Sequence, residues 1–318
     1  MFQDFADLIT YNVFHLVPGD RLASSVNFFI YDVIKIYSLI FTVLFIISLL
    51  QTFLPISKME EFLCGKKGKF YGYFIASFMG AVSPFCSCSS IPLFVGFLKA
   101  RIPLGVSFAF LVTSPLVNEV VLVMMGGLFG WKVAIIYALS GIVLGIMAGI
   151  VLDILKLEKE ILVDGYQGQI KIISEKELPS TYIEKLNYAK NDTIKTFMKL
   201  WWIIIVGVAF GALLHGYVPQ ELIMDVVSKF GIYAVPMAVI IGIPIYAGCS
   251  AVVPVIFSIT SAGIPLGTSL AFLMSIAGLS LPEALMLKKL MTIKLLLVFY
   301  GIVAVGIIII GYLFNLIF

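Results

Sequence analysis

Eight long apolar runs divide the chain and limit what it can fold into. They cover residues 30–54, 70–98, 102–126, 133–152, 197–218, 231–262, 264–287 and 290–316. A helix needs about 20 mostly apolar residues to cross a bilayer. Since 61% of the residues are hydrophobic and only 12% are charged, the chain could not cover the surface of a soluble domain. The sequence therefore predicts an all-α polytopic membrane protein, with about eight to ten membrane segments.

Charge and cysteine usage exclude several classes of protein. The net charge of +3 is too small to suggest a nucleic-acid partner. The four cysteines show no CxxC pair and no spacing typical of zinc ligands, and a large apolar chain in lipid needs no disulfide scaffold. No glycine-rich nucleotide-binding loop is present. We therefore expect no metal and no cofactor, and the lipid bilayer and a small molecule as partners.

One hydrophilic stretch separates two membrane parts. Residues 153–196 hold seven lysines and eight acidic residues. We interpret them as a linker between a first repeat at 30–152 and a second at 197–318. Residues 1–29 are predicted to form an amphipathic segment near the membrane surface.

The two membrane parts resemble each other at a shift of 162 residues. Ile102-Pro103-Leu104-Gly105 then falls on Ile264-Pro265-Leu266-Gly267, and Pro92 falls on Pro254. The thirty pairs from Val82 to Leu111 contain ten identities without a gap. Prolines and glycines in register are hard to explain by apolar composition alone. We infer an internal repeat.

The placement of Lys and Arg predicts the orientation. Cations lie in the loop at 58–69, at 99–101, in the linker and at 288–289, and all of these are expected in the cytoplasm. The runs 70–98 and 231–262 would each enter and leave on one side, as hairpins of half-helices, although two spans remain an alternative for each. Both termini would then face outward. The halves would start on opposite sides of the membrane, which is the inverted-topology repeat of many transporters.

Run 70–98 is interrupted by the motif Ser83-Pro-Phe-Cys-Ser-Cys-Ser-Ser-Ile-Pro92. Two prolines make a continuous helix unlikely. Irregular backbone persists in a membrane only where protein buries it or where it lines a polar cavity. The expected lining residues of this break are Cys86, Ser87, Cys88, Ser89 and Ser90. The alternative is that small residues here simply let helices approach closely.

Residues 242–254 form the equivalent break in the second repeat, and its candidate site residues are Cys249 and Ser250. Ser90 and Ser250 are expected as N-caps, with Pro92 and Pro254 in the first turn of the helix that follows. Such helix ends would favour an anion or the thiolate form of a cysteine.

A second polar cluster interrupts run 102–126. Thr113, Ser114 and Asn118 of this cluster are expected to bind the substrate, and Glu119 follows them. A carboxyl inside a membrane is costly and is a functional candidate by default, so Glu119 is expected to carry protons or to pair with a cation. Alternatively, Asn118 and Glu119 cap a helix at the interface. Glu283 is the nearest counterpart, and the neighbouring Lys288 and Lys289 favour a surface position for it.

These motifs are similar to those of a known family. The CSCSS motif, the following IPLGVSFAFLVTSPLVNE and the duplicated GIPLG region resemble the predicted-permease family that includes the ArsP-type organoarsenical efflux permeases. The resemblance covers residues 30–316. It implies export of trivalent organoarsenicals by some members, contact of cysteine thiols with the metalloid, and the inner or plasma membrane of a prokaryote.

Several functions fit the sequence, and none of the favoured ones is enzymatic. The first is a secondary transporter that exports a small thiol-reactive solute, with possible proton coupling, since thiolates suit soft centres. The second is a permease for another small solute, with the cysteines as polar lining. A non-transporting subunit of a larger complex is a third, and oligomers are compatible with all of these. A membrane thiol oxidoreductase is disfavoured, because cysteines two residues apart form a strained disulfide.

Overall fold

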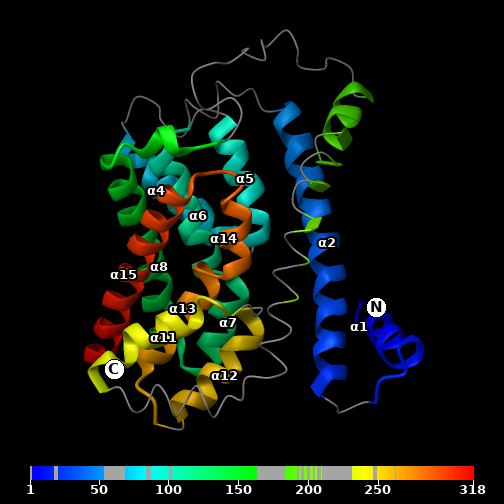
Figure 1. Cartoon of the computed structure of the whole chain (residues 1–318). Coiled ribbons are helices and arrows are strands. Elements are labelled where there is room, and N and C mark those ends of the chain that lie inside the picture. The colour runs from blue at the N-terminus through cyan, green and yellow to red at the C-terminus, as the bar shows by residue number, and fades with distance from the viewer. Residues whose placement is uncertain are drawn as a thin grey trace.

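The computed structural model describes residues 2–17, 21–53, 69–83, 87–99, 102–162, 183–191, 193–194, 197–198, 201–202, 205, 209, 231–245, 249–261 and 263–318. Within this part of the chain the structure is almost entirely helical, as predicted (Figure 1). The one bridge recorded between extended residues joins Ile161 and Met291.

The N-terminal segment folds against the start of a long helix. Helix α1 (Phe2–Asp7) and the π-helix η1 (Leu8–Val13) lie beside α2 (Arg21–Phe53). The buried amide of Asn27 donates to Asp7 Oδ1 at 2.7 Å and accepts from Gln3 at 2.9 Å. These bonds attach the segment to α2. Because α2 runs from Arg21 to Phe53, the predicted boundary at residue 30 falls inside this helix.

After α2, five further helices are described in the first half. They are α4 (Lys69–Val82), α5 (Ser87–Lys99), α6 (Leu104–Leu116), α7 (Glu119–Leu128) and α8 (Trp131–Ile154). With 14 and 13 residues, α4 and α5 are each about 20 Å long at 1.5 Å per residue. That is less than the roughly 30 Å of a hydrocarbon core. The expected break in run 70–98 is confirmed, and both short helices pack on α6.

The second half repeats these elements in the same order. The 3-10 turn η4 (Gly231–Tyr233) and α11 (Ala234–Gly242) are followed by α12 (Cys249–Ser261), α13 (Leu266–Gly278), α14 (Leu281–Leu287) and α15 (Ile293–Ile317). Helices α12, α13, α14 and α15 each begin 162 residues after α5, α6, α7 and α8. The repeated sequence thus gives the same helix starts in both halves.

Helices α6 and α13 form the centre of the bundle. Every residue of α6 is buried, and so is every residue of α13 after Leu266. Each helix starts after a proline in extended conformation, Pro103 or Pro265. The duplicated Ile-Pro-Leu-Gly motif therefore starts both central helices.

Paired glycines hold the long outer helices close to the central ones. A Cβ on Gly149 of α8 would collide with the carbonyl oxygen of Gly105 in α6, and a Cβ on Gly267 of α13 would collide with that of Gly311 in α15. These pairs are equivalent at the 162-residue shift. Small residues allow the same close approach in membrane helices generally.

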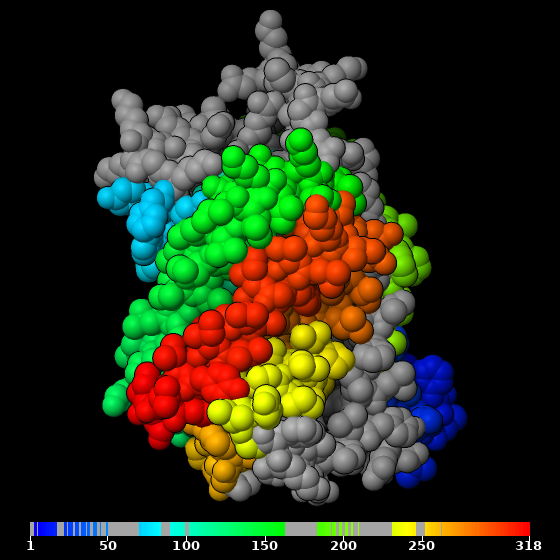
Figure 2. Space-filling model, turned by 60° about the vertical axis from the view of Figure 1, so that its left-hand side comes forward, coloured from blue at the N-terminus to red at the C-terminus, as the bar shows by residue number. Residues whose placement is uncertain are grey.

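Several helices are long and apolar enough to cross a membrane. Among the described residues these are Trp131–Ile154, Leu266–Leu287 and Ile293–Ile317, and α6 with α7 forms a fourth if the 42° bend between them lies within one span. Figure 2 shows α15 crossing one face diagonally between α8 and α11. Its exposed residues recur at four-residue spacing, as expected for a stripe that faces lipid: Leu297, Val305, Ile309 and Leu313. The chain is an all-α polytopic membrane protein.

Contacts between the halves are reciprocal. The equivalent helices α6 and α13 contact each other, and so do α8 and α15. Helix α7 packs against α12, and the equivalent pair, α14 and α5, also packs together. Residues near the start of α8 lie at the end of α15, since Lys132 stacks over the Phe318 ring. Helices α8 and α15 are therefore antiparallel.

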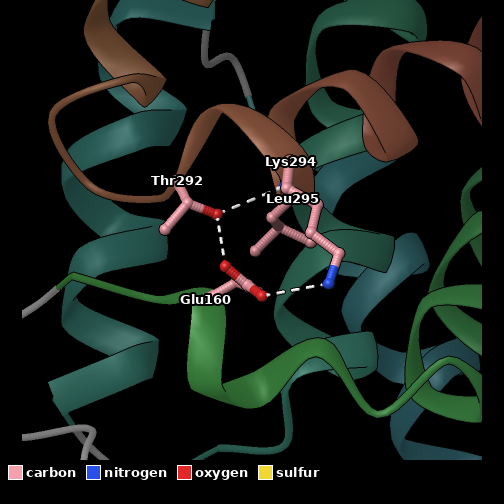
Figure 3. Close-up of polar contacts among 4 residues, drawn as sticks. All are labelled: Glu160, Thr292, Lys294 and Leu295. Carbon is pink, nitrogen blue, oxygen red and sulfur yellow. Dashed lines mark hydrogen bonds and ion pairs between the residues drawn. The ribbon is translucent and has the colours of Figure 1, made fainter.

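A polar contact joins the halves where the linker begins. The 3-10 turn η2 (Leu157–Glu160) follows α8 and places Glu160 beside the start of α15 (Figure 3). The Glu160 carboxylate accepts from Thr292 Oγ1 at 2.7 Å and from Lys294 Nζ at 3.3 Å. The backbone N–H of Thr292 donates to Glu160 O at 2.9 Å. We call Glu160, Thr292 and Lys294 the linker-face clamp.

Candidate functional site

The second helix of each broken segment starts with one serine and one cysteine. Helix α5 begins with Ser87-Cys88 and α12 begins with Cys249-Ser250, which are equivalent positions. The side chains of Ser87, Cys88, Ser89, Cys249 and Ser250, and Cys86 as a whole, lie outside the described residues. Their role as lining residues stays a prediction.

The predicted N-caps are wrong. Helix α5 starts at Ser87 and α12 at Cys249, so Ser90 and Ser250 lie inside the helices. Proline at an inner position cannot donate to the carbonyl four residues earlier, which is Cys88 for Pro92 and Ser250 for Pro254. Pro92 nevertheless lies inside α5, among the residues of that helix that pack into the core: Ile91, Phe94, Phe97 and Leu98.

The first motif and the second polar cluster meet in space. The Ser90 and Ser114 hydroxyls are 2.6 Å apart and hydrogen-bonded, and both residues are buried. This bond joins α5 to α6 just before the end of α6. Sequence placed these residues in two separate motifs, and the packing of α5 on α6 brings them together.

Thr113 has a packing role within the same cluster. Its hydroxyl donates to Ala109 O of its own helix at 2.9 Å. A Cβ on Gly145 of α8 would collide with that hydroxyl oxygen. Ser275, the equivalent of Thr113, donates to Val239 O of α11 at 2.6 Å. Thr113 thus lies between α6 and α8, and Ser275 joins α13 to α11.

Asn118 and Glu119 lie at the bend between α6 and α7. The Asn118 side chain accepts from Val120 N at 2.8 Å and forms the N-cap of α7. Glu119 is in the first turn and its side chain is exposed on the protein. A carboxylate there is favoured by the helix dipole. Asn118 therefore has a structural role, and the coupling role of Glu119 stays a prediction.

The second broken segment is fastened to the break between α13 and α14. The backbone N–H of Leu281 donates to Ile243 O at 3.1 Å. The Tyr300 hydroxyl of α15 donates to Ser280 O at 3.0 Å. The end of α11, the start of α14 and the middle of α15 are thus linked by polar contacts inside the bundle.

Glu283 is the residue that sequence reasoning misplaced. The predicted surface position is wrong, because only 2% of Glu283 is exposed. The nearby lysines suggested a surface, but Lys288 and Lys289 follow the end of α14 while Glu283 lies in its first turn. The unused signal was its apolar surroundings in run 264–287. Among the described residues, no group of three metal-binding side chains comes together.

Comparison with known proteins identifies relatives along most of the chain. A family described as a predicted permease matches residues 21–316. UPF0718 protein MJ0584 of Methanocaldococcus jannaschii is 22% identical over 78% of this chain and 83% of its own length. UPF0718 protein YraQ of Escherichia coli is 26% identical over 83% and 73%, respectively.

A relative from Streptococcus mutans carries a more specific name. This putative two-component membrane permease complex subunit is 24% identical over 56% of this chain and 55% of its own length. No solved structure has significant similarity to the chain.

Proposed function

Because the chain belongs to the predicted permease family, which matches it over residues 21–316, we propose that it is a secondary transporter working by alternating access. Its two halves would be inverted-topology repeats that rock against each other around a central site. The site would lie between the two broken segments, the usual place for substrate in such folds.

The reciprocal contacts between the halves carry this proposal. When residue i contacts the equivalent of j, and j contacts the equivalent of i, the two units are related by a two-fold axis. Helix α6 contacts its own equivalent, α13, and α8 contacts its own equivalent, α15. The contact of α5 with α14 has its equivalent in the contact of α12 with α7. The antiparallel course of α8 and α15 supports an axis that lies in the membrane plane.

The proposed substrate is a small thiol-reactive solute, such as a trivalent organoarsenical, moved outward. The support is that each half-length helix, α5 and α12, starts with a cysteine in its first two residues. A helix N-terminus favours a thiolate, and thiolates bind soft centres. Cys86 and Cys88 would face Cys249 and Ser250 across the axis.

Serine variants test this role. Cys86→Ser and Cys88→Ser should be made in the full chain and expressed in cells sensitive to phenylarsenite. We expect normal membrane levels and loss of resistance, and slower alkylation of the wild-type cysteines when phenylarsenite is bound. If both serine variants confer wild-type resistance, thiol coordination is refuted and the breaks only form a polar lining.

Glu119 is proposed to take part in proton coupling. It lies at the bend of a membrane segment, in the first turn of α7. Glu119→Gln should keep expression but reduce transport and flatten its dependence on pH. Unchanged transport across pH would leave Glu119 with only a capping role.

A second candidate function is that of a subunit in a permease complex. The observation in its favour is the name of the Streptococcus mutans relative. Purification of the chain from its own cells, followed by transport assays with the chain alone in liposomes, separates the two. Transport by the chain alone supports an independent permease, and activity that needs a co-purifying second chain supports the subunit.

A further inference from the structure

Glu283 differs from every other charged residue whose side chain the structure describes. It is the one Asp, Glu, Lys, Arg or His among them that is buried, at 2% exposure. It also lies within the membrane-length segment Leu266–Leu287. A carboxyl in such a place is costly to keep charged and usually serves a function. The roles proposed above leave it unused.

The surroundings of Glu283 connect both broken segments. It lies on α14, whose first residue, Leu281, is bonded to Ile243 at the end of α11. Helix α14 packs against α5, which carries the Ser/Cys motif of the other segment. Tyr300 of α15 holds the break before α14 through its hydrogen bond to Ser280 O, three residues before Glu283. A change in the protonation of Glu283 therefore acts next to residues of both halves.

Few other titratable groups face this position. On α15 the titratable group next to this position is Tyr300, whose hydroxyl donates to Ser280 O. Helices α11 and α13 contain no titratable residue. Helix α5 contributes Cys88 near its start and Lys99 at its end, whose side chains are outside the described set. Lys288 and Lys289, after α14, are exposed. Glu283 is thus the one buried carboxyl that the described side chains place on α14, the helix that packs against α5.

We propose that Glu283 is a proton-binding site that controls the contact between α14 and α5. The carboxyl binds a proton when α14 is closed on α5, as in this structure. It releases that proton when the halves move and water enters between the two helices. The role rests on the proposed function, in which this movement would open the central site.

Cysteine labelling at different pH values tests the proposal without a substrate. Leu285→Cys, a half-buried position on α14, is placed in a full chain whose four native cysteines are serine. The rate at which this cysteine reacts with a water-soluble maleimide is measured in liposomes. It is divided by the rate for Glu158→Cys, an exposed position, because this ratio corrects for the ionisation of the thiol. We expect this ratio to fall as pH is lowered, because protonation closes the contact.

Glu283→Gln mimics the protonated carboxyl, so the ratio should stay low at every pH. The matched control Glu184→Gln, an exposed linker residue, should follow the parent. A ratio independent of pH in the parent, or still dependent on pH in Glu283→Gln, overturns the proposal.

Glu283→Asp covers the case in which Glu283→Gln does not fold. It keeps a carboxyl in a changed position, so the pH dependence should remain with a shifted midpoint, and an unshifted midpoint overturns the proposal. Failure of the chain to transport phenylarsenite would refute the proposed substrate alone, because the labelling needs no transport.

Discussion

Leu116 and Gly278 contact each other at the centre of the bundle, although they are equivalent positions in the two halves. A Cβ on Gly278 would lie 3.1 Å from Leu116 Cδ2. Leu144 and Gly306, also 162 residues apart, meet in the same way between α8 and α15. Contact between equivalent positions is what the proposed two-fold axis between the halves would produce. In both places a leucine from the first half fits against a glycine from the second.

This fit predicts compensation between the two positions. Gly278→Leu alone should destabilise the protein by about 1–3 kcal/mol through overpacking. Leu116→Gly alone should leave a cavity and also destabilise it. The double variant exchanges leucine and glycine across the axis, so much of the stability should return. Thermal unfolding of the purified proteins measures this, and additive losses in the double variant would contradict the proposed two-fold relation.

Gly149→Ala should be destabilising, although alanine is usually better in a helix by about 1 kcal/mol. The new methyl group would collide with Gly105 O and lie 3.0 Å from Ala109 Cβ, so α8 must move away from α6. Gly301→Ala is the matched control, because nothing lies within 4 Å of its Cβ position on α15. Thermal unfolding should show opposite signs for the two variants. A stabilised Gly149→Ala protein would contradict the close α6–α8 packing.

The linker-face clamp predicts a pH-dependent contribution to stability. The hydrogen bond from Thr292, followed by that from Lys294, holds the pKa of Glu160 below its usual value of 4.5. A lowered pKa in the folded state stabilises the protein above the unfolded value, and this stabilisation is lost as pH falls through the folded value. The difference in melting temperature between wild type and Glu160→Gln should therefore be constant near neutral pH and disappear in acid. Glu158→Gln, exposed in the same turn, should show no such dependence.

The orientation predicts which residues a membrane-impermeant reagent can reach. The N- and C-termini both lie in the lower half of Figure 1, and η2 lies at the opposite end of α8. With the linker in the cytoplasm, Phe318→Cys in a cysteine-free background should react in intact cells. Glu158→Cys should react only after permeabilisation. The reverse pattern would show that the orientation is inverted. Equal labelling of the two cysteines in intact cells would contradict their placement on opposite sides of the membrane.

The sequence by itself determined the helices, their breaks and the repeat. Apolar runs about 20 residues long predict membrane helices because the bilayer leaves few alternatives for the backbone. The prolines of residues 83–92 predict a break, and the 162-residue shift relates the starts of α12 to α15 to those of α5 to α8. These are local properties, so neighbouring residues alone are enough to show them.

Only the tertiary structure decided which residues are buried together. The start of α5 at Ser87, with Pro92 inside the helix, is known from the folded chain and differs from the start near Ser90 that the prolines predicted. The Ser90–Ser114 bond and the burial of Glu283 depend on residues from other helices. Burial is set by every helix that packs on a position, so one apolar run cannot reveal it. For that reason the lysines beside Glu283 suggested a surface, and the packing of α14 placed this carboxyl inside.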